Sequence, residues 1–227
     1  MMKIAVLGTG MVGQALAGRL DELGHEVTVG TREVAATMAR TAPDAMGNPP
    51  YPAWGGAHPR VRLATFAGAA ADAELLVNAT SGGASMAALA AAGAENLAGK
   101  VLIDTANPLD FSQGFPPSLF VKDTDSLGEQ IQAAYPELKV VKTLNTLTAA
   151  LMVDPAPLAG GQHSVFVSGN DPDAKKTVTG LLESFGHADV IDLGDIGAAR
   201  GTEMLMSLWL RLMGALNTPM FNFKVVR

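Results

Sequence analysis

The sequence of 227 residues contains no cysteine. This absence excludes a disulfide framework, a zinc–thiolate site and a cysteine nucleophile. Histidine is scarce as well, and the four histidines stand apart in the sequence without the spacing of metal ligands: His25, His58, His163 and His187. We therefore expect no dedicated metal site.

Aromatic residues make up only 5% of the chain and charged residues 17%, whereas hydrophobic residues make up 48%. This composition is typical of a compact α/β protein rather than a disordered chain. The net charge of −6 gives no general attraction to nucleic acid. The first apolar run is too short for a signal-peptide core or a membrane span. We expect a soluble, cytoplasmic protein with no nucleic-acid or membrane partner.

The most informative motif is a G-x-G-x-x-G sequence near the N-terminus. Residues 3–7 before it predict a buried parallel strand, a helical pattern follows it, and residues 26–29 predict the next strand. In this context the glycines permit a tight turn and a close approach to a pyrophosphate, and the helix N-terminus offers free N–H groups. The predicted pyrophosphate-binding residues are Gly8, Thr9, Gly10, Met11, Val12 and Gly13.

The end of the second predicted strand indicates which dinucleotide is bound. An NAD site has an acidic residue there for the ribose 2′-OH, whereas this chain has Thr31 and Arg32. Both can donate to a 2′-phosphate, with Thr9 nearby as a third donor. One charge-assisted bond contributes about 1.5–3 kcal/mol, so Arg32 alone favours NADP by about ten- to hundredfold. Glu33 is interpreted as a charge in the first turn of the next helix.

Three later apolar runs, residues 74–80, 100–105 and 138–144, predict further strands that end in small polar residues, and a flexible polar turn is expected at residues 81–83 after the first of them. The carboxyl ends of parallel strands form the ligand edge of an open α/β sheet. The residues predicted along the nicotinamide side of the cofactor are Thr80, Ser81, Gly82, Ala106 and Asn107. Asn145 is the candidate catalytic residue, because it could orient the acceptor or the carboxamide. Asp104 is interpreted as a structural carboxylate at a strand end.

Alternating strands and helices predict a doubly wound, mostly parallel Rossmann sheet with a small C-terminal appendage. We expect an NADP-binding domain at residues 1–154 and a C-terminal domain at 155–227. The remaining predicted elements are helices at 126–134 and from 171 to 185, strands at 163–168 and 189–193, and a helical stretch at 196–216. That last stretch is apolar nearly all round, which predicts a homodimer contact unless its apolar surface is buried within the chain.

Residues 43–60 contain five prolines and several glycines and are predicted to form no regular element. Long loops of this kind are often lids or binding loops. Tyr51 and Trp54 are candidates to cover a flat ligand, and Trp54 could equally anchor the loop to the body of the protein.

Over most of its length the chain resembles the NADP oxidoreductase, coenzyme F420-dependent family. The resemblance rests on the glycine motif, the Gly30-Thr31-Arg32 ending, the segment 140–146 and the C-terminal helix with its short tail. It implies a Rossmann domain, a small dimerising C-terminal domain, and hydride transfer between NADP(H) and the deazaflavin F420. Where archaeal members carry histidine in a segment V-V-x-A-L-H-T, this chain has Asn145, which can bond a ring carbonyl but does not titrate near neutral pH.

Hydride transfer between two bound cofactors needs proximity, orientation and exclusion of water more than a general base. Two alternatives stay open at this point. One is an NADPH-dependent reductase of a small carbonyl or imine, for which Tyr51 is the nearest candidate proton donor. The other is a non-catalytic NADP sensor. The sequence identifies neither the hydride acceptor nor the physiological direction.

Overall fold

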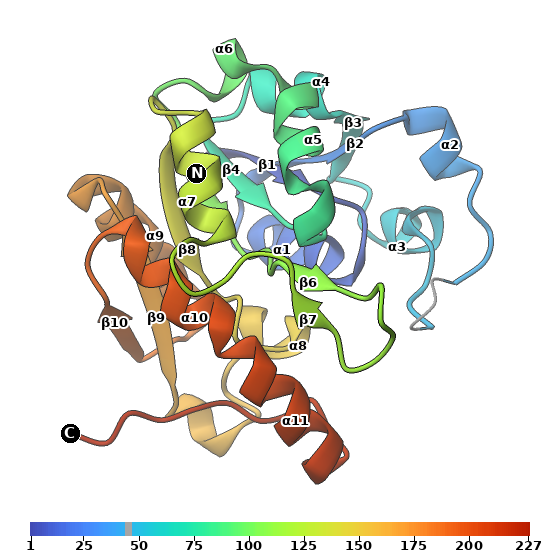
Figure 1. Ribbon diagram of the computed structural model, residues 1–227. Coiled ribbons are helices and arrows are strands. Elements are labelled where there is room, and N and C mark those ends of the chain that lie inside the picture. Colours follow the sequence, from blue (N-terminus) through green and yellow to red (C-terminus); the bar gives the residue numbers. More distant parts are fainter. Residues whose placement is uncertain (44–46) are drawn as a thin grey trace.

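A computed structural model describes residues 1–43 and 47–227 and contains one eight-stranded sheet (Figure 1). The strand order is β10-β9-β8-β5-β4-β1-β2-β3. The strands are β1 (Lys3–Leu7), β2 (Glu26–Thr31), β3 (Arg62–Thr65), β4 (Leu75–Asn78), β5 (Val101–Asp104), β8 (Lys139–Thr143), β9 (Ser164–Gly169) and β10 (Asp189–Asp192). The strands from β3 to β8 run parallel, β9 is antiparallel to β8, and β10 is parallel to β9. The predicted doubly wound, mostly parallel Rossmann sheet is confirmed.

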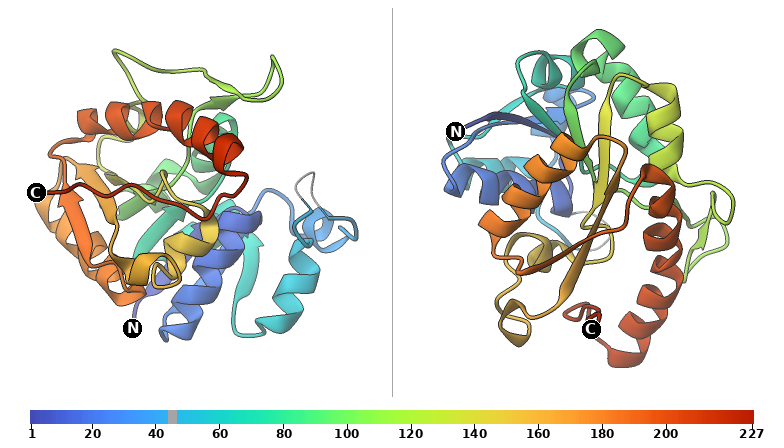
Figure 2. Two further views of the ribbon diagram at one scale, coloured as in Figure 1. Left: turned by 90° about the horizontal axis from the view of Figure 1, so that it is seen from below. Right: turned by 90° about the vertical axis from the view of Figure 1, so that its left-hand side faces the viewer.

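Helices cover both faces of the sheet (Figure 2). One face packs on α1 (Met11–Glu22), α3 (Tyr51–Ala57), α8 (Ala149–Val153) and α9 (Pro172–Phe185). The other packs on α4 (Phe66–Ala71), α5 (Gly82–Ala92), α6 (Ala94–Leu97), α7 (Leu127–Ala134) and α10 (Ala199–Met204). The central strands are buried on both sides, which explains why their sequences are continuously apolar rather than alternating.

A third, smaller core lies beside the sheet, where α11 (Met206–Leu216) meets a hairpin and the C-terminal tail (Figure 1). The hairpin consists of β6 (Leu109–Asp110) and β7 (Ser118–Leu119). Trp209 of α11 stacks on Phe221 of the tail, with ring centroids 5.1 Å apart. The tail is tied to β9, since the Ser164 N–H donates to the Phe223 carbonyl at 2.9 Å.

The helical stretch predicted at 196–216 is divided into a short 3-10 helix, Ile196–Ala198, followed by α10 and α11. The helix predicted at 126–134 is α7, and Ser126 caps it: Ser126 Oγ accepts from the Glu129 N–H at 3.1 Å and donates to its carboxylate at 2.8 Å. The reciprocal bond of a capping box is not made, because the Ser126 N–H donates to Asp125 at 2.8 Å. The domain boundary predicted between residues 154 and 155 falls between β8 and β9, which pair with each other in the same sheet.

Two local predictions are wrong. The proline-rich segment 43–60 was expected to lack regular structure, yet it contains α3, which begins after Pro50 and has Pro52 in its first turn. Proline is tolerated there because the first N–H groups of a helix have no partner within the helix. The turn expected at residues 81–83 is instead the start of α5, with Ser81 as its N-cap residue. Residues 44–46 of the proline-rich segment lie outside the described residues.

Candidate active site

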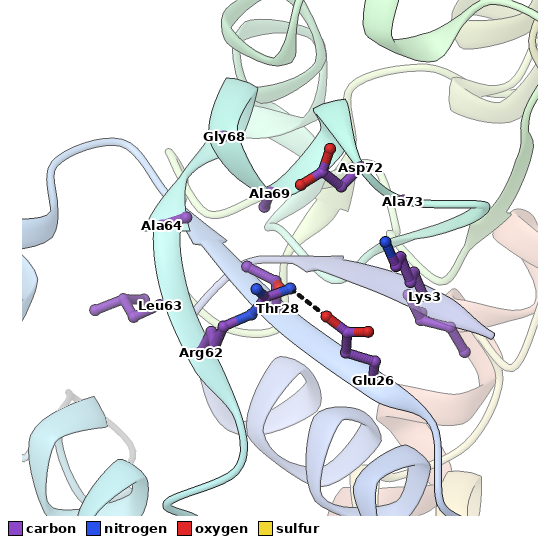
Figure 3. A pocket seen from close by; sticks show the side chains of 11 residues that line it. Lys3, Glu26, Thr28, Arg62, Leu63, Ala64, Gly68, Ala69, Asp72 and Ala73 are labelled. Atoms are coloured by element: carbon purple, nitrogen blue, oxygen red, sulfur yellow. Dashed lines mark hydrogen bonds and ion pairs between the residues drawn. The ribbon is translucent and has the colours of Figure 1, made fainter. Parts of the chain in front are cut away.

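A pocket lies at each end of the parallel strands, and the two pockets differ in volume and in the residues that line them. At the amino ends, a pocket of about 140 Å³ is lined by Lys3, Glu26 and Arg62, and Glu26 and Arg62 form an ion pair at 2.7 Å (Figure 3). At the carboxyl ends, a pocket of about 420 Å³ extends from the glycine motif to the ends of β2 and β4. The larger pocket lies beside the point where the strand order reverses, between β1 and β4. Ligands of open α/β sheets bind at this point.

The glycine motif forms the turn from β1 into α1 as predicted. Gly8 has a φ of +125°, and a Cβ there would lie 2.5 Å from the Ala79 carbonyl oxygen. A Cβ on Gly13 would lie 2.1 Å from the Gly8 carbonyl oxygen, so helix and strand can approach only without a side chain at that position. The N-cap residue of α1, Gly10, provides no side-chain cap. The first N–H groups of α1, from Met11 onward, are therefore left for a phosphate, and the residues fit a dinucleotide.

The far end of the pocket is cationic. Arg32 lines it together with Arg40, which follows α2 (Val34–Met38). Within the described ranges, neither guanidinium has an acidic partner. Glu33 also lines this pocket, and its carboxylate caps α2 by accepting from the Ala35 N–H at 3.2 Å. The interpretation of Glu33 as a helix-terminal charge agrees with this contact.

Hydroxyl groups complete the cationic end. Thr9 and Thr31 line the pocket, and the Thr31 hydroxyl lies 2.7 Å from that of Thr37. Two hydroxyls share one hydrogen bond, so one hydroxyl hydrogen stays available to a ligand. Sequence reasoning missed Thr37 and Arg40. Their only sequence signal is their position in and after the helix that follows Arg32.

On the other side of the glycine motif, Thr80 and Ser81 line the same pocket after β4. The Thr80 hydroxyl donates to the Asn78 amide oxygen at 2.7 Å and lies 3.0 Å from the Ser85 hydroxyl. Gly82 is buried against the carbonyl of Asn107, which brings the start of α5 against the residues that follow β5.

Ala106 and Asn107, at the end of β5, and Asn145, at the end of β8, lie together but outside the pocket that the glycine motif lines. The Asn107 amide donates to the Asn145 carbonyl at 2.7 Å, and the Asn145 amide donates to the Asn107 side-chain oxygen at 2.9 Å. Asn145 is 3% exposed and also donates to the Thr202 carbonyl of α10 at 3.0 Å. Both hydrogens of its amide are thus used within the protein, and direct contact with an acceptor stays a prediction.

The structure reveals a buried cluster of charges beneath this edge, formed by Asp104, Lys142 and Glu203. The ammonium of Lys142 lies 2.9 Å from the Asp104 carboxylate and 2.8 Å from that of Glu203. The side chains of Lys142 and Asp104 are 0% exposed and that of Glu203 is 2% exposed. Burial opposes the charge on Lys142, but the two carboxylates outweigh it and raise its pKa, so it stays protonated at neutral pH.

The two aromatic residues of the proline-rich segment lie elsewhere. Tyr51 is 4% exposed and belongs to the core beneath α1, where burial raises the pKa of its phenol. Trp54 packs against the same core and stacks on His58, with centroids 4.1 Å apart. Trp54 therefore anchors α3 to the body of the protein, which is the second of the two roles considered for it.

Among residues 1–43 and 47–227, no three His, Asp or Glu side chains are grouped so that they could hold a metal ion. Across the same part of the chain, every helix is too short or too polar to cross a membrane.

The doubly wound sheet, the glycine turn at its switch point and the cationic pocket define a dinucleotide-binding protein of the Rossmann class. Residues 3–108 match the family model described as NADP oxidoreductase, coenzyme F420-dependent. A crystal structure of a candidate F420-dependent NADP reductase from Arthrobacter sp. FB24 is 64% identical, covers 100% of both chains and superposes with a TM-score of 0.96. The chain belongs to the NADP oxidoreductase, coenzyme F420-dependent family, and it is an NADP-dependent oxidoreductase.

Two more distant relatives have curated names. The F420-dependent NADP reductase of Methanothermobacter marburgensis is 29% identical over 218 residues, covering 93% of this chain and 92% of that protein. The rat (Rattus norvegicus) protein Metalloreductase STEAP3 is 27% identical over 218 residues. That match covers 96% of this chain but only 38% of the rat protein, so the chain corresponds to a part of that longer relative.

Proposed function

We propose that the protein transfers a hydride between NADP(H) and a second cofactor, the deazaflavin F420. The observation that carries the NADP half is the pocket in which Arg32 and Arg40 lie beside the glycine turn, with no acidic partner among residues 1–43 and 47–227. The F420 half is supported by the family and by the names of the relatives from Arthrobacter and Methanothermobacter.

In this proposal, successive parts of the dinucleotide are bound at the ends of neighbouring strands. The end of β2 holds the 2′-phosphate, and the turn after β1 holds the pyrophosphate with the N–H groups of α1. The other half of the dinucleotide then extends over the ends of β4 and β5, toward Thr80, Ser81, Gly82, Ala106 and Asn107. NADPH supplies a hydride when bound. The protein has to bind, orient and exclude water, which amides, hydroxyls and backbone groups can do.

Asn145 is proposed to act at this edge by fixing Asn107, since the two amides bond to each other. The carbonyl or imine reductase alternative is less well supported, because Tyr51, its candidate proton donor, is buried in the core beneath α1.

We further propose a homodimer, in which α11 is the contact and residues 155–227 form the dimerising part of the chain. The support is the exposed apolar surface of the helix: Leu208 is 50% exposed and Leu216 is 54% exposed. The half-buried Leu212 lies between them in the helix sequence, and exposed apolar surface of this kind is typical of an interface.

The test mixes the purified protein with NADPH and F420, and with NADP⁺ and reduced F420, and follows absorbance. A panel of small carbonyls and imines with NADPH runs in parallel. Turnover with F420 is the expected result. Turnover only with the panel would establish the small-molecule reductase instead, and tight NADPH binding without any turnover would establish the sensor.

A further inference from the structure

The buried cluster of Asp104, Lys142 and Glu203 converges on the residues after β5. We call Ala106 and Asn107 the β5 turn. Lys142 donates to the Ala106 carbonyl, and Asp104 accepts from the Ala106 N–H at 3.2 Å. Both polar backbone groups of Ala106 are thus held by the cluster.

The cluster is anchored on two further elements, β4 and α7. Asp104 also accepts from the Asn78 amide of β4 at 2.8 Å, and Asn78 in turn holds Thr80. Glu203 of α10 accepts from the N–H groups of Leu127 and Gly128, at the start of α7, at 2.8 and 3.0 Å. The residue before Glu203 accepts from Asn145, whose side chain holds Asn107. Helix α10 therefore reaches the β5 turn by two independent routes.

Stability alone does not explain why three charges are buried here. Removing a carboxylate and an ammonium from water costs free energy that their attraction often fails to recover, and well-packed apolar residues frequently stabilise a fold equally well. A buried polar network that is fully satisfied does, however, fix one arrangement of the groups it bonds. All three N–H donors of Lys142 are used, on Asp104, Glu203 and Ala106.

We propose that the buried cluster positions the β5 turn for the nicotinamide half of NADP(H), with Lys142 as the central positioning residue. This inference rests on the proposed function, in which that half extends over the end of β5. The cluster lies far along the sheet from the cationic end of the pocket, on the other side of β1. Its loss should therefore affect how the nicotinamide is held and leave the binding of the 2′-phosphate unchanged.

The test compares two ligands by calorimetry: NADPH, and 2′,5′-ADP, which lacks the nicotinamide half. Glu203→Gln keeps an acceptor oxygen for the start of α7 but removes one charge from the cluster. A triple variant with Lys142→Met, Asp104→Asn and Glu203→Gln removes every charge and avoids an unpaired buried ion. Arg200→Gln is the matched control, because Arg200 pairs α10 with Glu129 of α7 but does not contact the β5 turn.

The wild type should bind NADPH more tightly than 2′,5′-ADP. Glu203→Gln and the triple variant should lose most of this difference while their affinity for 2′,5′-ADP is unchanged, and Arg200→Gln should retain it. Turnover with the hydride acceptor should fall by about ten- to hundredfold, since small misplacements of reacting groups have effects of this size.

The inference would be overturned if the variants lost affinity for NADPH and 2′,5′-ADP equally, or if they kept the full difference in affinity between the two ligands. It would also be overturned if the wild type bound the two ligands equally well. Failure of both variants to fold would make the cluster a stability element and overturn it as well. A wild type that binds NADH as tightly as NADPH would instead contradict the proposed function, which separates the two failures.

Discussion

Arg40 should share the recognition of the 2′-phosphate with Arg32. Its backbone N–H bonds to the carbonyl of Thr37, whose side chain is buried against Thr31, so the residue is held at the rim of the pocket. Both arginines are exposed, and exposed charge pairs contribute about 0.2–1 kcal/mol. Arg40→Ala should therefore weaken NADPH binding by about 1.4- to fivefold. Arg32 directly follows β2, where a charge-assisted hydrogen bond to the 2′-phosphate of about 1.5–3 kcal/mol is expected, so Arg32→Ala should weaken binding by about ten- to hundredfold.

Calorimetry with NADPH and NADH at two salt concentrations measures the contributions of Arg32 and Arg40 to the free energy of binding. The Debye length falls from about 10 Å at 0.1 M salt to about 3 Å at 1 M, so the effect of Arg40→Ala should fade as salt is added. Arg62→Ala is the control, because Arg62 is an exposed arginine at the opposite end of the strands, paired with Glu26 (Figure 3). The reasoning fails if Arg40→Ala weakens NADH and NADPH equally, or leaves NADPH affinity unchanged.

Three further predictions follow from other contacts. Leu208→Glu should convert the proposed dimer to monomer or aggregate in light scattering, because an unpaired charge is costly to bury, while Ser207→Glu on the same helix should not; a monomeric wild type would refute the interface. Hydrogen bonds from Lys224 and Ser164 lower the pKa of Asp189 from 3.8 to about 2. The stabilisation of the C-terminal tail by Asp189 is therefore present above pH 3.8 and is lost as the pH falls toward 2. Hydrogen exchange of residues 221–227 should rise over that interval, and in Asp189→Asn it should already be fast at pH 7. Asn145→Ala should lower turnover with little change in NADPH affinity, because Lys142 still holds the β5 turn, and an equal loss of both would argue against its proposed role in fixing Asn107.

The half of the site near the glycine motif could be predicted from the sequence because its signals are local. The glycines, the strand before them and the Thr31-Arg32 ending all lie within one βαβ unit, and the structure brings Gly8, Thr9, Gly10, Thr31 and Arg32 to one pocket. The prolines of residues 43–60 do not exclude a helix, because prolines before and within a first turn are compatible with a helix such as α3.

The buried cluster could not be predicted in this way. Lys142 lies within an apolar strand, and nothing next to it in the sequence reveals that its partners are Asp104 and Glu203, which come from β5 and α10. The one available signal was a lysine inside a run that otherwise predicted a strand buried on both faces. Helix α5 was missed for a different reason: its alanine-rich sequence has no polar face, so its apolar residues show no helical period.

The buried cluster also affects how the protein unfolds. Its hydrogen bonds join β4, β5, β8, α7 and α10. Opening β5, β8 or α10 alone would break an ion pair of the cluster, and opening β4 or α7 alone would take hydrogen-bond donors from a buried carboxylate. Local opening near the β5 turn is then as costly as unfolding of the surrounding unit. Amide protons around Ala106 should exchange only through global unfolding, and on heating the activity should be lost together with the fold rather than before it.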